Sequence, residues 1–351
     1  MKHYLGSISL LFLTAPAFGQ SAVADGGHLA QPDTTGVWVQ PAQGRAAMPV
    51  WGHVDGIRIG LAPLPGPRGL LRIYAPYLDY DFPQVINFIA FEPIPKGEDR
   101  RGFSELEMSS MHPGLQGKHF WSSDTVDYAA RLDGVFPARG RIGKDHGEET
   151  LTVYIFAEPF DNGAAVYARI RFFASRPYEF EITGYATPSS RPLQYFIPTA
   201  TMGNKARLRT LYLKDRKYSS LELWPDYQGQ HFTAHAFFSQ KDMIHNKKGN
   251  VYFIAGPNEA NYQQTVYTRN THDHWRYNGK VATQYWCRPS PSKLLKGAVN
   301  GRYTYWGSRE PIPGGVAIEN FEFIEPFENG QVYIYGISPL APELLIKHIQ
   351  Q

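Results

Sequence analysis

The sequence predicts an all-β protein, built as a large antiparallel double sheet (a β-sandwich or super-sandwich) with few or no helices. Aromatic residues make up 14% of the 351 residues, and such residues favour strands. The 27 Pro and 33 Gly supply turns, which recur roughly every 8–12 residues, as in sandwiches and barrels. No stretch shows the periodicity of an amphipathic helix longer than about two turns.

The N-terminus is typical of a secretory signal peptide. Met1-Lys2-His3 is a basic start, and an apolar run extends from Leu5 to Phe18. Small residues at Ala17 and Gly19 suit cleavage before Gln20, so we predict that residues 1–19 are removed. The run is too short to span a membrane. We therefore expect a secreted or periplasmic protein with no membrane span.

Composition also predicts the domain organisation. Residues 20–45 are rich in Ala, Gly, Gln and Pro, which predicts a mostly irregular lead-in. No linker-like shift follows, so residues 46–351 are predicted to form a single large β-sandwich domain. Cys287 is the single cysteine, which excludes an intramolecular disulfide, and we interpret it as a buried, inert thiol.

Charge argues against a nucleic-acid partner. The net charge of +3 is small and dispersed, and no nucleic-acid motif is present. Short basic pairs such as Arg100-Arg101 are interpreted as solvated loop charges.

One hairpin can be predicted with its register. Residues 166–172 and 178–183 alternate apolar and polar side chains on either side of a five-residue connection. This register sets Arg171 opposite Glu179 and Arg169 opposite Glu181, as cross-strand ion pairs. The alternative is that these arginines grip an acidic sugar.

A strand near the C-terminus contains the strongest candidate for a catalytic residue. Alternation places Glu319 on the same face as Ala317, Phe321 and Phe323. Burial of a carboxylate among aromatic side chains raises its pKa toward the range that acid–base catalysis needs. We predict Glu319 as a catalytic acid or base; the alternative is a Glu bonded to backbone or to an Arg at a sheet opening.

The segment from Gly315 to Ile337 resembles the last two strands of the galactose mutarotase-like super-sandwich superfamily. There, a strand of small residues presents a Glu, and a turn leads into the final strand. Glu319 matches the catalytic base, and Glu328-Asn329-Gly330-Gln331-Val332-Tyr333 matches the turn and closing strand. The resemblance implies a super-sandwich with sugar chemistry at Glu319. Residues 199–204, where the family places its catalytic His, contain none, and the superfamily also includes domains of glycoside hydrolases and polysaccharide lyases.

Two histidines are further candidates for catalysis. His272 and His274 would point the same way in a strand, as two metal ligands do, but no third ligand is identifiable, so we predict no metal and no cofactor. His274 beside Trp275 is a candidate general acid, with an ordinary loop role as the alternative. His53 is a second candidate acid or base.

Carboxylates complete the candidate catalytic set. Glu105 and Glu107 alternate onto one face of a short predicted strand, and Glu92 ends another. Two carboxylates that face one another would suit glycoside hydrolysis. Glu105 is therefore a candidate catalytic residue.

Arginine and aromatic side chains are candidates for sugar binding. Arg207 and Arg209 share a strand face, and arginines bind carboxylates and sulfates with two parallel hydrogen bonds. Aromatic faces stack on sugar rings. The alternatives are ordinary salt bridges and core packing. The predicted substrate-binding residues are Arg68, Arg207, Arg302, Tyr305, Trp306 and Trp275.

Motif absences narrow the function. The P-loop, GxGxxG, GxSxG and HExxH patterns are missing, which excludes the nucleotide, serine-hydrolase and zinc-protease classes that carry them. We expect a secreted carbohydrate-active enzyme that cleaves an oligo- or polysaccharide by acid–base chemistry, with glycoside hydrolysis slightly favoured. A polysaccharide lyase acting on a uronate glycan, a sugar mutarotase or epimerase, and a non-catalytic carbohydrate-binding protein are the alternatives. The sequence leaves the glycan and the oligomeric state open.

Overall fold

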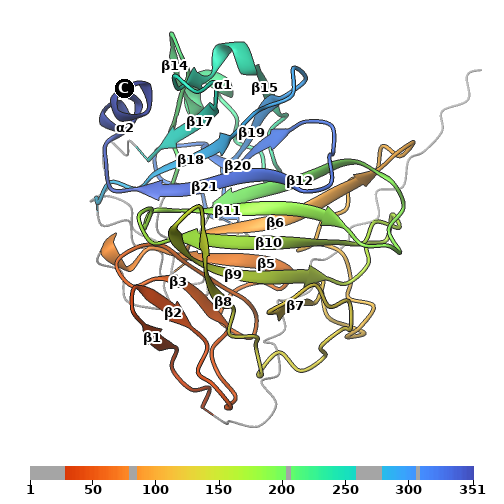
Figure 1. Ribbon diagram of the computed structural model, residues 1–351. Helices are drawn as coiled ribbons and strands as arrows, with labels where there is room; N and C mark the ends of the chain where they lie inside the picture. Colours follow the sequence, from red (N-terminus) through yellow and green to blue (C-terminus); the bar gives the residue numbers. More distant parts are fainter. Residues whose placement is uncertain (1–27, 79–84, 203–206, 258–278, 306–308) are drawn as a thin grey trace, which may run out of the picture.

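The computed structural model describes residues 28–78, 85–202, 207–257, 279–305 and 309–351. Strands are by far the commonest regular structure in these residues and form two large antiparallel sheets, which confirms the predicted fold class. Figure 1 shows the two sheets as layers, with β9, β10 and β11 of one sheet in front of β5 and β6 of the other. The predicted signal peptide, residues 1–19, lies outside the described residues.

The first sheet has ten strands among the described residues. Its order places strands from the N-terminal half beside strands from the C-terminal end of the chain. In spatial order the strands are β1 (Asp33–Thr35), β2 (Trp38–Gln40), β3 (Val50–His53), β4 (Arg58–Gly60), β5 (Leu70–Tyr74), β6 (Val85–Pro95), β12 (Leu193–Met202), β20 (Ala317–Ile324), β19 (Lys296–Arg302) and β15 (Ala236–Ser239).

The second sheet has eleven strands within the same described ranges. Two short strands lie off its main path: β8 (Arg141–Asp145) pairs with β9, and β16 (Ile244–His245) pairs with β17. The main path is β14 (Lys217–Ser219), β13 (Thr210–Tyr212), β17 (Val251–Gly256), β18 (Thr283–Arg288), β21 (Gln331–Ser338), β11 (Glu179–Ala186), β10 (Val166–Phe173), β9 (Glu148–Ala157) and β7 (Phe120–Ser123).

Helices are short in the described part of the chain. They are α1 (Ser220–Leu223), α2 (Pro342–Gln350) and the 3₁₀ helices η1 (Pro76–Leu78) and η2 (Gln240–Asp242). None of these helices is long and apolar enough to cross a membrane. Although no helix was predicted there, α2 packs Leu345, Ile346 and Ile349 against the outer face of the second sheet.

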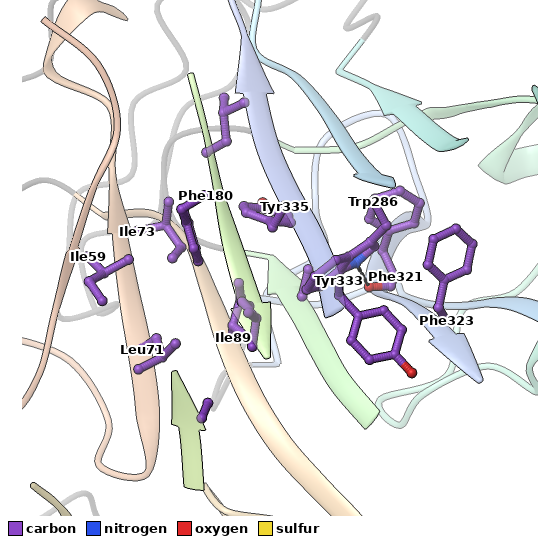
Figure 2. Close-up of a cluster of buried hydrophobic side chains, with 14 of the residues drawn as sticks. Ile59, Leu71, Ile73, Ile89, Phe180, Trp286, Phe321, Phe323, Tyr333 and Tyr335 are labelled. Carbon is purple, nitrogen blue, oxygen red and sulfur yellow. Dashed lines mark hydrogen bonds between the residues drawn. The ribbon is translucent and has the colours of Figure 1, made fainter. Parts of the chain in front are cut away.

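The hydrophobic core lies between the two sheets. Alternation along β10 turns Ala168, Ile170 and Phe172 inward, since successive side chains in a strand point to opposite faces. Figure 2 shows how the first sheet contributes Leu71 and Ile89 to the same core. Each buried Leu, Ile or Phe side chain contributes roughly 1.5–3 kcal/mol relative to exposure.

Aromatic side chains from both sheets interlock in the core. Trp286 of β18 lies among Phe321, Tyr333 and Tyr335, with its ring centroid 4.9 Å from that of Tyr335 (Figure 2). Its Nε1 donates to the carbonyl oxygen of Phe321 at 2.7 Å. This bond satisfies the buried indole and ties β18 of the second sheet to β20 of the first.

Two short strands lie within the lead-in that was predicted to be mostly irregular. Within residues 20–45, β1 and β2 form a hairpin in the first sheet. Trp38 of β2 is fully buried, and its Nε1 donates to Glu149 Oε1 of β9 at 2.7 Å. The composition of this segment, which is rich in Ala, Gly and Gln, does not indicate a hairpin. The hairpin is anchored by one buried side chain, that of Trp38.

The predicted hairpin exists as β10 and β11, but its register differs by two residues. Arg171 pairs with Glu181 and Arg169 with Thr183, so the predicted opposition of Arg171 to Glu179 and of Arg169 to Glu181 is wrong. The connection occupies residues 174–178, one position later than predicted. A two-residue shift keeps each side chain on its face, so the alternation in the sequence does not distinguish the two registers.

Candidate functional site

Polar side chains gather on the outer face of the first sheet, where β6, β12 and β20 lie side by side. Phe321 and Phe323 of β20 are in the core, so Glu322 between them faces outward. Thr199 of β12 is its cross-strand partner and donates through Oγ1 to Glu322 Oε2 at 2.6 Å. Glu92 of β6 follows the core residue Phe91 and so also faces outward.

Arg101, from the loop after β6, joins these carboxylates. Its Nη2 donates to Glu322 Oε1 at 2.7 Å. Its Nη1 forms an ion pair with Glu92 Oε2 at 2.7 Å, although the angle between the two groups does not suit a hydrogen bond. The Arg101 side chain is only 15% exposed. The interpretation of Arg100-Arg101 as solvated charges is therefore wrong for Arg101, whose charge is held by two buried carboxylates.

Glu105 completes what we call the carboxylate cluster: Glu92, Glu105 and Glu322 around Arg101. Burial raises the pKa of Glu92 well above its usual value, against the attraction of Arg101. Burial likewise raises the pKa of Glu105 to about 7, against its own backbone hydrogen bond and the charge of Arg101. Glu105 therefore exchanges its proton near neutral pH.

His235 is the exposed titratable group beside this cluster. It lies just before β15, with its side chain 32% exposed and its Nε2 4.0 Å from Glu322 Oε1. Burial lowers the pKa of His235, while the charge of Glu322 opposes this shift. The imidazole is therefore mostly neutral at pH 7.

An amide orients the His235 ring. Asn300 Nδ2 lies 3.3 Å from His235 Nε2, and Asn300 Oδ1 accepts from the backbone N–H of Asn320 at 3.2 Å. The second contact orients the amide so that its NH₂ group faces the ring. Because an amide NH₂ only donates, Nε2 of the neutral imidazole accepts this hydrogen bond, and the ring proton lies on Nδ1.

An exposed aromatic ring flanks the site. Phe237 of β15 pairs with Ala298 of β19, and Ala298 pairs with Glu322 of β20, so all three side chains share the outer face. The Phe237 ring is 60% exposed and stacks on His235 with centroids 5.8 Å apart. An exposed ring beside titratable groups is the arrangement that sugar binding uses.

Glu319 lies on the same strand but not on the predicted face. A β-bulge pairs Asn300 with Asn320 and Gly301 with Ile318, which leaves Glu319 as the extra residue. The bulge breaks the alternation, so Glu319 does not share the core-facing side of Phe321 and Phe323. Burial raises the pKa of Glu319 to about 7, and the nearby charge of Arg302 opposes this shift.

Arg302, a predicted binding residue, lies near Glu319 at the end of β19. Its Nη2 donates to the carbonyl oxygen of Tyr305 at 3.1 Å, and its guanidinium lies 5.4 Å from the centroid of the Phe232 ring. Tyr305 itself is buried with Met202 and Ile312, so it packs in a core cluster and does not form the predicted stacking platform.

The remaining described candidates lie elsewhere or are buried. His53 is on β3, separated from β6 by β4 and β5, and its Nδ1 accepts from the backbone N–H of Asp55 at 3.0 Å. Arg68 contacts His112 Nδ1 at 3.0 Å, and Arg207 is 2% exposed. His274, Trp275 and Trp306 lie outside the described residues.

Several residues of the site were missed by sequence reasoning. Glu322 follows Glu319 by three positions, a spacing that a regular strand would place on opposite faces. Nothing in the sequence pattern singles out His235, Thr199, Asn300 or Asn320. Glu105 was predicted, and it is the candidate catalytic residue that joins the cluster.

In the part of the chain that the structure describes, no group of three or more His, Cys, Asp or Glu side chains is arranged to hold a metal ion. Comparisons with protein-family models, with curated proteins and with solved structures find no match for this chain.

Proposed function

We propose that this protein is a carbohydrate-active enzyme, a glycoside hydrolase, with its active site on the outer face of the first sheet. One observation carries the proposal: Glu105 holds a proton near neutral pH, and neutral His235 can accept one, beside the same Arg101–Glu322 pair. Environments that push the pKa values of two groups apart in this way are typical of an acid and a base.

The proposed reaction uses each group once. Glu105 gives its proton to the oxygen that leaves the anomeric carbon, and the bond between that carbon and oxygen breaks. Water bonds to the carbon in its place, and Nε2 of His235 gives up its contact with Asn300 and takes the proton that the water loses. Glu322 lies 4.0 Å from His235 Nε2 and stabilises the imidazolium that forms.

A neutral or weakly charged sugar suits the site. Arg101 is already paired with Glu92 and Glu322, so the cluster has little positive charge left to attract a uronate. The exposed Phe237 ring offers the apolar face of a sugar a surface on which to stack. The apolar run from Leu5 to Phe18 supports an exported enzyme.

Elimination at a uronate is the second candidate, and Arg302 supports it. His235 would take the proton at C5, the bond from C4 to its oxygen would break, and Glu105 would protonate that oxygen as a double bond forms. Arg302, two residues after Asn300 on β19, supplies a positive charge on the same side of the sheet.

A polysaccharide panel with two readouts tests the proposal. Neutral and uronate-containing glycans are incubated with the protein, and new reducing ends and the ultraviolet absorbance of unsaturated products are measured. Hydrolysis gives reducing ends alone, and elimination gives both. We expect Glu105→Gln and His235→Asn each to lower turnover by roughly a hundredfold or more, since each removes one proton transfer.

Matched controls separate chemistry from folding. The controls are Glu343→Gln and His146→Asn. Glu343 lies on α2 with a side chain that is 62% exposed, and His146 lies on a turn with a side chain that is almost fully exposed. Both should keep wild-type turnover. Equal turnover in Glu105→Gln, His235→Asn and these controls would overturn the assignment. Sugar binding without any product would instead identify a non-catalytic carbohydrate-binding protein.

A further inference from the structure

A cavity opens on the outer face of the second sheet, on the other side of the sandwich from the candidate active site. Its volume is about 220 Å³, and β8, β9 and β10 line it. Thr150, Thr152 and Tyr154 of β9 form its floor, since Leu151 and Val153 between them face the core.

Arginines surround this cavity, and one of them is already neutralised. Arg171 Nη2 lies 2.7 Å from Glu181 Oε2, and its Nη1 lies 2.8 Å from Asp145 Oδ2. This pairing of Arg171 with Glu181 is of the predicted kind, although in a different register. Cross-strand ion pairing therefore accounts for Arg171.

Ion pairing does not account for Arg169. The observed register sets it opposite Thr183, to which its Nη2 donates at 3.1 Å. Within the described residues, no carboxylate lies within ion-pair distance of Arg169, and its buried Nε has no hydrogen-bond partner. Arg141 is exposed on β8 and also lacks a described carboxylate partner. Arg141 and Arg169 are thus left at the cavity without a described carboxylate partner, and Lys144 lines it as well.

Aromatic rings continue from the cavity along the same face. Tyr167 stacks on Tyr185 with centroids 4.9 Å apart and lies 6.5 Å from Tyr154. Tyr154 and Tyr185 are partly exposed. Cations beside tyrosines match a sugar ring that carries an anionic group, because the ring stacks on the aromatic face and the anion accepts from the guanidinium.

We propose that the outer face of β8–β11 is a second binding site, for an anionic glycan. Its sulfate or carboxylate group occupies the cavity between Arg141 and Arg169, and its sugar ring lies over Tyr154. The site takes from the proposed function only the expectation that the ligand is a sugar. It would hold a polymer on the face opposite the active site and so raise the local concentration of chain around the enzyme.

Binding measurements with defined polymers test this site. Dextran sulfate supplies sulfate, polygalacturonate supplies carboxylate, and dextran is the neutral polymer. Oligo-dT supplies phosphate and stacking bases in place of an anionic sugar. We expect dextran sulfate or polygalacturonate to bind in a salt-sensitive way and dextran not to bind. The Arg141→Gln/Arg169→Gln variant should weaken that binding about tenfold or more, because charge-assisted hydrogen bonds are lost.

Controls keep the result separate from folding and from the active site. Lys247→Gln/Lys248→Gln removes two exposed charges from the β16–β17 turn and should bind like wild type. Arg141→Gln alone changes an exposed residue and keeps the test available if Arg169→Gln perturbs folding. Glu105→Gln should bind unchanged. Equal weakening in the lysine control, or tighter binding of oligo-dT than of either anionic glycan, would overturn the proposal.

Discussion

Glu319 shows how one buried carboxyl group can couple stability to pH. It is 6% exposed, and its pKa of about 7 in the folded protein compares with an ordinary value of 4.5. Between these pH values the folded state holds a proton that the unfolded chain has released. The folded state is therefore more stable at low pH. This contribution to the free energy of unfolding is lost as the pH rises from 4.5 to 7.

Replacing this group should remove the pH dependence that it causes. We expect Glu319→Gln to have nearly wild-type stability at about pH 5 and to gain up to about 3 kcal/mol over wild type at about pH 8, since Gln is never charged. Urea unfolding of both proteins at the two pH values measures the difference. The same difference at both pH values would show that Glu319 is ionised in the folded protein.

At the scale of an element, a glycine sets how closely β11 approaches β12. A Cβ atom on Gly184 would lie 2.4 Å from Cδ1 of Phe196, a core residue of the opposite sheet. No side chain fits there without moving this ring. The two sheets are thus in direct contact at Gly184, with the aromatic ring filling the space that a side chain would take.

Substitution at this contact should cost stability. We expect Gly184→Ala to lower the free energy of unfolding by about 1–3 kcal/mol through overpacking. Gly143→Ala on β8 is the matched control, because its Cβ would meet nothing nearer than Thr150 Oγ1 at 3.9 Å. That variant should stay within about 0.5 kcal/mol of wild type by urea unfolding. A loss of equal size in both variants would show a general intolerance of strand alanines.

At the scale of the molecule, the two sheets share one core. Trp286 of the second sheet is fully buried and donates to the carbonyl oxygen of Phe321 in the first. A second link joins Asn87 Nδ2 of the first sheet to the Tyr335 hydroxyl of the second at 2.8 Å. Sheets joined in this way are expected to unfold together.

Truncation of the central Trp should therefore destabilise both sheets at once. We expect Trp286→Ala to cost about 3–5 kcal/mol, with coincident transitions in far-ultraviolet circular dichroism and in Trp fluorescence. Leu294 is 66% exposed, so Leu294→Ala should leave the midpoint of the unfolding transition unchanged. Two separate transitions would show that the sheets unfold independently.

Local sequence pattern was sufficient to predict the double sheet and part of the site. Alternation of apolar residues determines which side chains of β9 and β10 enter the core, because the strand period is two. It also identified Glu105 as a candidate, but the strand predicted around Glu105 and Glu107 is wrong. Residues 104–106 form a turn, and Glu105 belongs to the cluster from that turn. The predictions that failed, for Arg101 and for the Arg169–Glu181 pair, each depended on a partner from another strand or loop.

Tertiary structure alone decided which residues meet at the site. Arg101, His235 and Glu322 are far apart in the chain, and the sheet order β6-β12-β20-β19-β15 brings them together. A bulge at Glu319 and a two-residue shift between β10 and β11 then set which charges find partners. Periodicity does not determine these features, because strand order, bulges and even-numbered shifts depend on contacts between distant segments.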